Sequence, residues 1–328
     1  MNYREFSDLG WRVSEVGLGC WQIGWCWGDI SDDDARKILK KALERGINFF
    51  DTSDTYGDGR SERFLSEILK SSSEKLYVTT KLGRRIRGTN YPRGYKNQPM
   101  EEFVDRSLQN LGIDCIDLLQ MHCPPIDVCQ KDETYELMDL LVKKGKIANY
   151  GISVYNLSEA YEAIKRPNIK SVQFVFNMFR QQPCDAFFEA ARKRKVALIA
   201  RGPLASGLLG GEITEKTVFP DNDHRNYNRG GEAFDVGDTF SGVNFERGLC
   251  AVEELRKILP SGFSLSHLAL KWILMHQEIT VVIPGAIDER QVDQNSSASN
   301  LEDISDLMPR IREIYKTYIE QDVHNRWM

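Results

Sequence analysis

Four side chains that suit acid–base chemistry follow short apolar runs in the sequence. Asp51 ends one such run, and Tyr56 follows it within the stretch DTSDTYG. Lys81 ends the next run, in TTKLG, and His122 ends the one after that, in LLQMHCP. In a barrel of parallel strands, active sites are built at the carboxyl ends of the strands. We therefore expect these four groups to lie together.

The four residue types suit the reduction of a carbonyl group. A tyrosine has a reference pKa of about 10, and a neighbouring ammonium such as that of Lys81 lowers this pKa, which makes Tyr56 a better proton donor. Asp51 would keep Lys81 charged and oriented. His122 would give a second hydrogen bond to the carbonyl oxygen that becomes the alkoxide. None of the four is a strong nucleophile, so the predicted reaction takes its hydride from a cofactor.

Each of these residues also has a purely structural interpretation. Asp51 and Lys81 are compatible with an ion pair of the core, and His122 with a core histidine; only their joint occurrence on three consecutive strand ends favours catalysis. Tyr161, with a lysine four residues later, matches the YxxxK spacing of short-chain dehydrogenases. Those enzymes need a glycine-rich strand–turn–helix, which residues 10–30 do not provide, so we expect Tyr161 to pack on an outer helix.

Eight short apolar runs alternate with segments of helical period. The runs are Val16–Cys20, Ile47–Ser53, Leu76–Leu82, Cys115–His122, Ile147–Tyr155, Ser171–Asn177, Val196–Leu204 and Thr280–Ala286. Ser31 suits the start of the first helix and Gly46 suits its end. The alternation predicts one α/β domain over residues 1–328, folded as a (β/α)8 TIM barrel, with an open doubly wound sheet as the alternative.

Three segments lie outside this repeating unit and account for the excess over a minimal barrel of ~250 residues. Residues Tyr3–Val16 predict a β-hairpin that plugs the closed end of the barrel. A polar, glycine-containing stretch from 210 to 242, after strand seven, has a length typical of a functional lid. Leu301–Glu320 predicts a C-terminal helix, and Asp322–Met328 a tail.

Composition and charge exclude several classes of protein. The 328 residues include 43 Lys and Arg against 48 Asp and Glu, a net charge of −5, with both signs interspersed, so no nucleic-acid partner is expected. No apolar run approaches the ~20 residues that span a bilayer, and no signal peptide is evident, which predicts no membrane association and a cytoplasmic location. Seven cysteines without CxxC and five histidines without HExxH indicate neither disulfides nor a metal site.

The strand-end motifs, taken in order, resemble those of the aldo-keto reductases over nearly the whole chain. The matching segments are GLGCWQIG (17–24), DTSDTYG (51–57), TTKLG (79–83), LLQMHCP (118–124), GISVYN (151–156), VQFVFN (172–177), GPLASGLLGG (202–211) and IPGAIDERQVDQN (283–295). The resemblance implies an NAD(P)H-dependent oxidoreductase in which Tyr56 is the general acid. Lys81 would tune it, Asp51 would pair with Lys81, and His122 would orient the carbonyl.

The same resemblance implies where a nicotinamide dinucleotide would bind. Ser153 and Gln173 would contact the carboxamide, although Val154 stands where the family often has an asparagine. Arg201 stands where many members stack a tyrosine on the nicotinamide, and its planar guanidinium suits the same role. The full set of implied cofactor contacts is Trp21, Ser153, Gln173, Arg201, Gly202, Pro203, Leu204, Ser206, Gly207, Leu208, Gly285, Ala286, Ile287, Gln291, Gln294 and Asn295.

The last matching segment bears on the choice between NADP(H) and NAD(H). Many members of the family bind the 2′-phosphate of NADP(H) with a basic residue near the start of this segment and with an arginine further along it. Here those places hold no basic residue, and only Arg290 remains, beside Asp288 and Glu289. The cofactor usual in the family favours NADP(H), and NAD(H) is the alternative.

The substrate is expected to be an uncharged aldehyde, ketone or sugar carbonyl, since the predicted pocket is aromatic. Its walls would come from Trp21, Trp25, Trp27 and Phe179, although the tryptophans are equally compatible with simple packing at the barrel mouth. Two alternatives remain: a redox-sensing, cofactor-binding subunit resembling potassium-channel β subunits, and a sugar dehydrogenase that works in the oxidative direction. No feature of the sequence predicts an oligomeric state.

Overall fold

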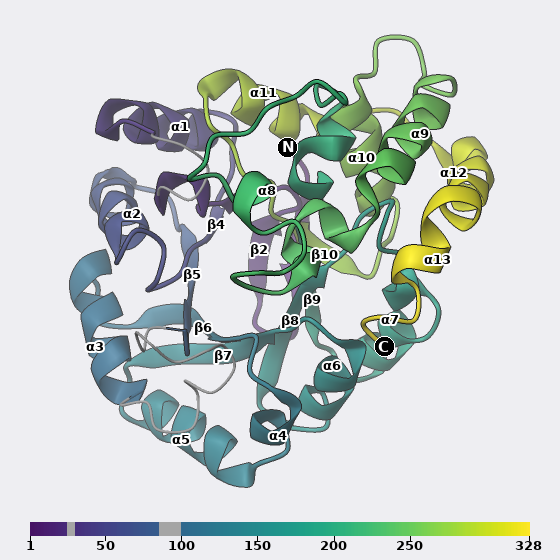
Figure 1. Cartoon of the computed structure of the whole chain (residues 1–328). Helices are drawn as coiled ribbons and strands as arrows, with labels where there is room; N and C mark the ends of the chain where they lie inside the picture. Colours follow the sequence, from purple (N-terminus) through teal and green to yellow (C-terminus); the bar gives the residue numbers. More distant parts are fainter. Residues whose placement is uncertain (25–29, 85–99) are drawn as a thin grey trace.

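Eight parallel strands follow one another in sequence order in a single sheet (Figure 1). The computed structural model describes residues 1–24, 30–84 and 100–328. The strands are β3 (Leu18–Gly19), β4 (Phe49–Asp51), β5 (Tyr77–Leu82), β6 (Ile116–His122), β7 (Ile147–Ser153), β8 (Ile169–Val175), β9 (Ala197–Arg201) and β10 (Ile279–Val282). Each overlaps one of the predicted runs, and the (β/α)8 fold is confirmed.

The first and last of these strands meet and close the sheet. Val16 bridges Val282 and Gly19 bridges Gly285, both in the parallel sense. The Gly17 N–H donates to the Val282 carbonyl at 2.8 Å. Closure removes the free edges of the sheet and brings segments from opposite ends of the chain to one rim.

Helices surround the strands as an outer layer (Figure 1). Those that follow successive strands are α1 (Asp32–Glu44), α2 (Arg60–Ser71), α3 (Met100–Leu111), α4 (Ile126–Cys129), α5 (Asp132–Lys143), α6 (Leu157–Ala163), α7 (Phe187–Lys193), α9 (Phe245–Arg256), α10 (Leu265–Leu274) and α11 (Glu289–Ser297). Helix α1 begins as predicted, because Ser31 Oγ accepts the Asp34 N–H at 3.1 Å. Gly46 takes the left-handed conformation just after its end. None of the described helices is long and apolar enough to cross a membrane.

The predicted N-terminal hairpin covers one end of the barrel. It consists of β1 (Tyr3–Phe6) and β2 (Trp11–Ser14), paired antiparallel. Phe6 and Val13 are completely buried in a cluster with side chains from the barrel strands, and the Phe6 ring stacks on Phe49 with centroids 5.6 Å apart. Since this end is filled by apolar packing, polar chemistry is confined to the opposite rim.

The long stretch from 210 to 242 contains α8 (His224–Tyr227) and two 3₁₀ turns, Val236–Asp238 and Phe240–Gly242. It is tied to the segment after β9, because Ser206 Oγ accepts the Phe240 N–H and donates to the Asp238 carbonyl, both at 3.0 Å. Asn177, just past β8, donates to Ser241 Oγ at 2.8 Å. These bonds fold the stretch back over the carboxyl-terminal rim.

The C-terminal segment departs from its prediction. Residues 301–304 are not helical; α12 (Met308–Ile314) begins later and continues through a π-helical turn into α13 (Glu320–Val323). The predicted tail is part of the packed structure, because Trp327 is only 3% exposed. Its indole N–H donates to Asp235 Oδ1 at 3.0 Å, and its carbonyl accepts the Leu157 N–H at 3.0 Å. A large aromatic side chain near the chain end thus anchors the terminus.

We expect Trp327→Ala to lower the free energy of unfolding by about 3–5 kcal/mol, because it leaves a cavity where a large aromatic was buried. It also uncovers the buried Arg180 guanidinium, which lies 3.7 Å from the ring centroid. Urea denaturation measures the change. Met328→Ala, at a side chain that is 59% exposed, is the control and should shift stability by less than about 0.5 kcal/mol. Equal stability of the two variants would show that the tail is not part of the core.

Candidate active site

The register of the sheet brings the polar strand ends together. Lys81 on β5 is opposite Gln120 on β6, and His122 on β6 is opposite Ser153 on β7. Ser153 in turn is opposite Gln173 on β8. Because side chains alternate along a strand, Gln120 and His122 point to the same face. A row of polar side chains therefore runs along the rim opposite the hairpin.

Asp51 and Lys81 form a buried ion pair. Lys81 Nζ lies 2.5 Å from Asp51 Oδ1, and the Lys81 side chain is 1% exposed. The second carboxylate oxygen accepts the side-chain amides of Gln120 and Gln173, at 3.2 and 2.7 Å. Burial opposes the charge on Lys81, but the Asp51 carboxylate outweighs it and the pKa of Lys81 is raised. The ammonium is therefore held charged.

Tyr56 lies in the turn after β4, with its hydroxyl 3.3 Å from Lys81 Nζ. It can take this place because Gly24 has no side chain; a Cβ there would lie 2.7 Å from that of Tyr56. Burial raises the pKa of Tyr56, and this effect exceeds the opposing effect of Lys81. Lys81 acts in the expected direction, but the sequence does not reveal how completely the phenol is buried, and burial decides the net change. Tyr56 remains a protonated phenol at neutral pH.

His122 lies beside Tyr56 as a neutral imidazole. The two rings meet edge to face with centroids 6.1 Å apart, and His122 Nδ1 lies 3.2 Å from Ser53 Oγ. Burial, followed by the positive charges of Arg84 and Lys81, lowers the pKa of His122 well below its usual value. A neutral imidazole carries one N–H, which suits a hydrogen bond to a carbonyl oxygen.

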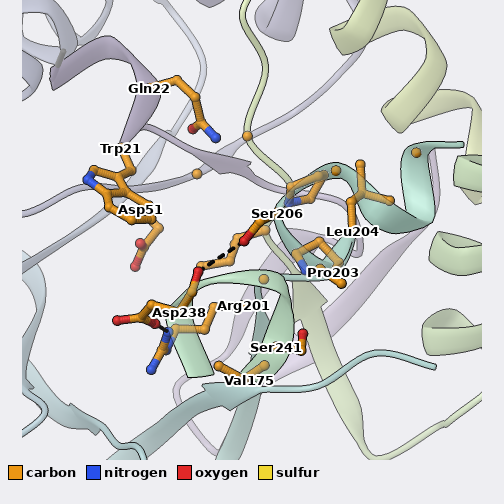
Figure 2. Close-up of a pocket in the computed structure, with 18 of the residues that line it drawn as sticks. Trp21, Gln22, Asp51, Val175, Arg201, Pro203, Leu204, Ser206, Asp238 and Ser241 are labelled. Carbon is orange, nitrogen blue, oxygen red and sulfur yellow. Dashed lines mark hydrogen bonds and ion pairs between the residues drawn. The ribbon is translucent and has the colours of Figure 1, made fainter. Parts of the chain in front are cut away.

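These side chains face a cavity of about 480 Å³ (Figure 2). Figure 2 shows Trp21 and Asp51 on one side, with Leu204 and Ser206 across from them. One end of the cavity is lined by Trp21, Tyr56, His122, Ser153 and Gln173, and the other by Ile287, Arg290, Gln291, Gln294 and Asn295. Among the described residues, no group of three His, Cys, Asp or Glu side chains is arranged to hold a metal ion.

The middle of the cavity is lined by a strained backbone segment. Arg201, Gly202, Pro203, Leu204, Ser206 and Gly207 all contribute to the wall. Ala205, Ser206 and Gly207 have successive positive φ values of 46°, 54° and 98°. Within this segment the Ala205 N–H donates to the Gly202 carbonyl at 3.1 Å, and the Gly207 N–H donates to the Leu204 carbonyl at 2.9 Å. The Ser206 hydroxyl, which is bonded to residues 238 and 240, helps to hold this conformation.

The far end of the cavity is built mainly from α11. Asn295 Nδ2 donates to the Gly285 carbonyl at 3.1 Å, and Gln291 Oε1 accepts the Ile287 N–H at 3.1 Å. Gln294 Nε2 donates to two serine hydroxyls at the start of α10, at 2.8 and 2.6 Å. Most of the side-chain amides here are therefore already fixed by the protein.

A few predicted site residues do not line the cavity. Phe179 is 1% exposed and belongs to the hydrophobic core, contrary to its predicted place in the substrate pocket. Its N–H donates to Asn177 Oδ1 at 2.8 Å in the turn after β8, and its ring lies near Gly248 of α9. Leu208 and Ala286 are likewise buried away from the lining. The predicted pocket residues Trp25 and Trp27 lie outside the described residues.

Several residues at this site were not predicted. Gln120 donates a hydrogen bond to Asp51. It stands two residues before His122 on the same strand, and this spacing is the sequence signal that both side chains share one face. Ser53 contacts His122 from within the DTSDTYG motif. Asp238 comes from the long stretch after β9, where no local pattern marks a residue that reaches the strand ends.

The chain is similar in sequence and in structure to known proteins. The profile of the Aldo/keto reductase family matches residues 15–316. The chain is 28% identical over 316 residues to the aldo-keto reductase YhdN of Bacillus subtilis (strain 168), covering 94% of this chain and 92% of YhdN. It is 25% identical over 339 residues to a probable voltage-gated potassium channel subunit beta of Arabidopsis thaliana, covering 99% and 98%. The solved structure of the glycerol dehydrogenase AKR11B4 from Gluconobacter oxydans superposes with a TM-score of 0.77 at 27% identity, covering 99% and 97%. The chain belongs to the aldo/keto reductase family.

Proposed function

We propose that this oxidoreductase reversibly reduces an aldehyde, ketone or sugar carbonyl to an alcohol with a nicotinamide cofactor. The observation that carries the proposal is the protonated Tyr56, 3.3 Å from Lys81 and beside neutral His122. A proton donor, a charge that stabilises its conjugate base and a second hydrogen-bond donor then meet at one end of a long cavity.

In the proposed reaction the carbonyl oxygen lies against Tyr56 and His122. Tyr56 gives its proton to this oxygen as negative charge builds there, and His122 donates a hydrogen bond to the same atom. Lys81 stabilises the phenolate left on Tyr56, and Asp51 keeps that ammonium in place. In the reverse direction the phenolate takes the proton from an alcohol.

The remainder of the cavity fits a nicotinamide dinucleotide, which would supply the hydride. Ser153 Oγ and Gln173 Oε1, 3.3 Å apart at the reacting end, offer a hydroxyl and an amide for the carboxamide. The turn of residues 204–208 would lie along the pyrophosphate. The Ala205 and Gly207 N–H groups already donate to the Gly202 and Leu204 carbonyls, so the Ser206 N–H is the donor that we propose for it. The α11 end would hold the adenosine, and Trp21 and Arg201 would flank the nicotinamide.

Arg290 supports NADP(H) over NAD(H). It lines the far end of the cavity, and its side chain is 65% exposed. Its contacts with Glu212 and Asp288 are long, at 3.5 and 3.9 Å. Exposed ion pairs of this kind contribute little, whereas a phosphate forms strong charge-assisted hydrogen bonds with a guanidinium. We propose that the 2′-phosphate of NADP(H) takes the place of these carboxylates.

We expect the purified protein to bind NADPH about tenfold more tightly than NADH, since one exposed charge-assisted contact is worth about 1.4 kcal/mol. Titration of each nucleotide, followed by fluorescence, gives both dissociation constants. Arg290→Gln should bring them to within about threefold of each other. Equal or tighter binding of NADH by the unmodified protein would favour NAD(H) instead.

Tyr56→Phe should lower kcat for aldehyde reduction by at least about 100-fold, because it removes the proton donor and keeps the ring. Steady-state oxidation of NADPH with a panel of aldehydes measures this loss. Cofactor affinity should change little, and the titration described above serves as the control for folding. Reduction at the unmodified rate would show that Tyr56 is not the general acid.

The same assay separates the two alternative functions. A redox-sensing subunit, favoured by the potassium-channel relative, would oxidise bound cofactor once and then stop. A reductase would complete many turnovers. A dehydrogenase working in the oxidative direction would consume sugar alcohols with NAD(P)⁺ faster than it reduces any carbonyl compound in the panel.

A further inference from the structure

The ring nitrogen that carries the single proton of neutral His122 decides whether this residue can act on a carbonyl. Nδ1 lies 3.2 Å from the Ser53 hydroxyl oxygen. In the proposed reaction the hydrogen bond to the carbonyl oxygen therefore comes from Nε2. A neutral imidazole donates from one nitrogen and accepts at the other. Nδ1 must then accept a hydrogen bond from Ser53, so that Nε2 keeps the proton.

The Ser53 hydroxyl has one proton and several neighbours. Its oxygen lies 3.2 Å from Asp54 Oδ1 and 3.0 Å from Thr55 Oγ1, and it accepts the Thr55 N–H at 3.3 Å. Ser53 is completely buried. Thr55 has a hydroxyl proton of its own to donate. The two groups that compete for the Ser53 proton are therefore His122 Nδ1 and the Asp54 carboxyl group.

The protonation of Asp54 decides this competition. An ionised carboxylate only accepts hydrogen bonds, so it would take the Ser53 proton. His122 would then bond to Ser53 through a proton on Nδ1, and Nε2 would have none to donate. A protonated carboxyl group can instead donate to Ser53 Oγ, which leaves the Ser53 proton for Nδ1. Only the second arrangement keeps the N–H at Nε2.

The surroundings of Asp54 favour its protonated form. Its side chain is buried, and the largest electrostatic effects of described residues on it come from Glu62 of α2 and Arg106 of α3. Glu62 is completely buried, and its carboxylate accepts two side-chain hydrogen bonds at 2.7 and 2.8 Å. Arg106 acts in the opposite direction but is paired with Asp58 at 2.9 Å. Burial, followed by Glu62, raises the pKa of Asp54 to about 8.

The neighbouring strands contribute one cation and one neutral group. The Lys81 carbonyl on β5 accepts the Asp54 N–H at 3.3 Å, but the Lys81 ammonium is paired with Asp51 at 2.5 Å. His122 on β6 is neutral. The charge of Lys81 is thus balanced by Asp51, and at neutral pH Asp54 carries its proton in most molecules.

We infer that Ser53 and Asp54 are positioning residues for His122: protonated Asp54 donates to Ser53, Ser53 donates to Nδ1, and Nε2 presents its N–H to the carbonyl oxygen. The inference rests on the proposed function and adds two residues to it. It also makes the site sensitive to pH. When Asp54 loses its proton to solvent, Ser53 turns its proton to the carboxylate, and the imidazole proton moves from Nε2 to Nδ1.

NMR of the protein labelled with ¹⁵N-histidine tests this order of hydrogen bonds. The chain has five histidines, and His122→Gln identifies the His122 signals by their loss. The proton should be on Nε2 at about pH 6.5 and increasingly on Nδ1 towards about pH 9.5. The midpoint should lie near the Asp54 pKa of about 8. The imidazole stays neutral throughout, because its own pKa is well below the usual value.

Two variants separate the roles of the positioning residues. Asp54→Asn cannot ionise, and its amide can donate to Ser53, so the proton should remain on Nε2 of His122 at about pH 9.5. Ser53→Ala removes the hydroxyl that joins the two groups, so the tautomer should no longer follow the pH. Asp33→Asn makes the same change at an 85% exposed carboxylate of α1 and is the matched control. Its midpoint should equal that of the unmodified protein.

Turnover should follow the same proton. Loss of one hydrogen bond to the carbonyl oxygen should lower kcat for aldehyde reduction about fivefold between about pH 7 and about pH 9 in the unmodified protein. In Asp54→Asn the two values of kcat should agree within about twofold. The dissociation constant of NADPH should not follow the pH in this way, since the lining of the cavity includes neither Ser53 nor Asp54.

Three spectroscopic results would overturn the inference: a proton on Nδ1 of His122 at low pH, a tautomer that does not change with pH, or the same change in Asp54→Asn. Tyr56→Phe should retain the change, which shows that the Tyr56 hydroxyl does not cause it. The spectra require no turnover, so they stand apart from the proposed function. That function alone fails if the expected spectra appear and no carbonyl compound is reduced.

Discussion

The buried Asp51–Lys81 pair is the interaction on which the arrangement of the site depends. A fully buried ammonium needs a carboxylate close by, and removal of one partner from such a pair costs about 3–5 kcal/mol. Asp51 meets this need only because amides from β6 and β8 satisfy its second oxygen. One carboxylate thus connects side chains from β4, β5, β6 and β8. The closed sheet is what brings these four strands around one point.

Burial also sets the protonation states. The same desolvation that keeps Tyr56 a phenol keeps His122 a neutral imidazole, while Lys81 retains its charge because Asp51 compensates it. A proton donor, a neutral hydrogen-bond donor and a fixed cation therefore coexist within one polar row. In open solvent at neutral pH a phenol and an ammonium would keep these same states, whereas an imidazole, with a reference pKa of about 6.5, would be partly protonated. Burial therefore changes the state of His122 most.

The apolar hairpin covers the amino-terminal end of the barrel, and the candidate active site lies at the carboxyl-terminal rim. The hairpin packs Phe6 into the amino-terminal end, whereas Trp327 is buried beside Asp235, Gly237 and Gly242 of the stretch from 210 to 242. The opposite rim receives the stretch from 210 to 242, which brings Asp238 into an ion pair with Arg201 at the end of β9. A loop that holds a charged partner for a strand end determines which charges a substrate meets.

The sequence by itself determined the eight strands, the ends of α1 and the four candidate catalytic residues, because these depend on local periodicity, on capping residues and on the rule that strand ends share one rim. Tertiary structure decided the rest. Phe179 is a core residue because the turn at Asn177 directs it inward, and the net pKa of Tyr56 rises because burial exceeds the effect of Lys81. The pairing of Asp238 with Arg201 and the helical path up to Trp327 join residues far apart in the chain. Such contacts depend on how distant segments pack, and no local pattern records that.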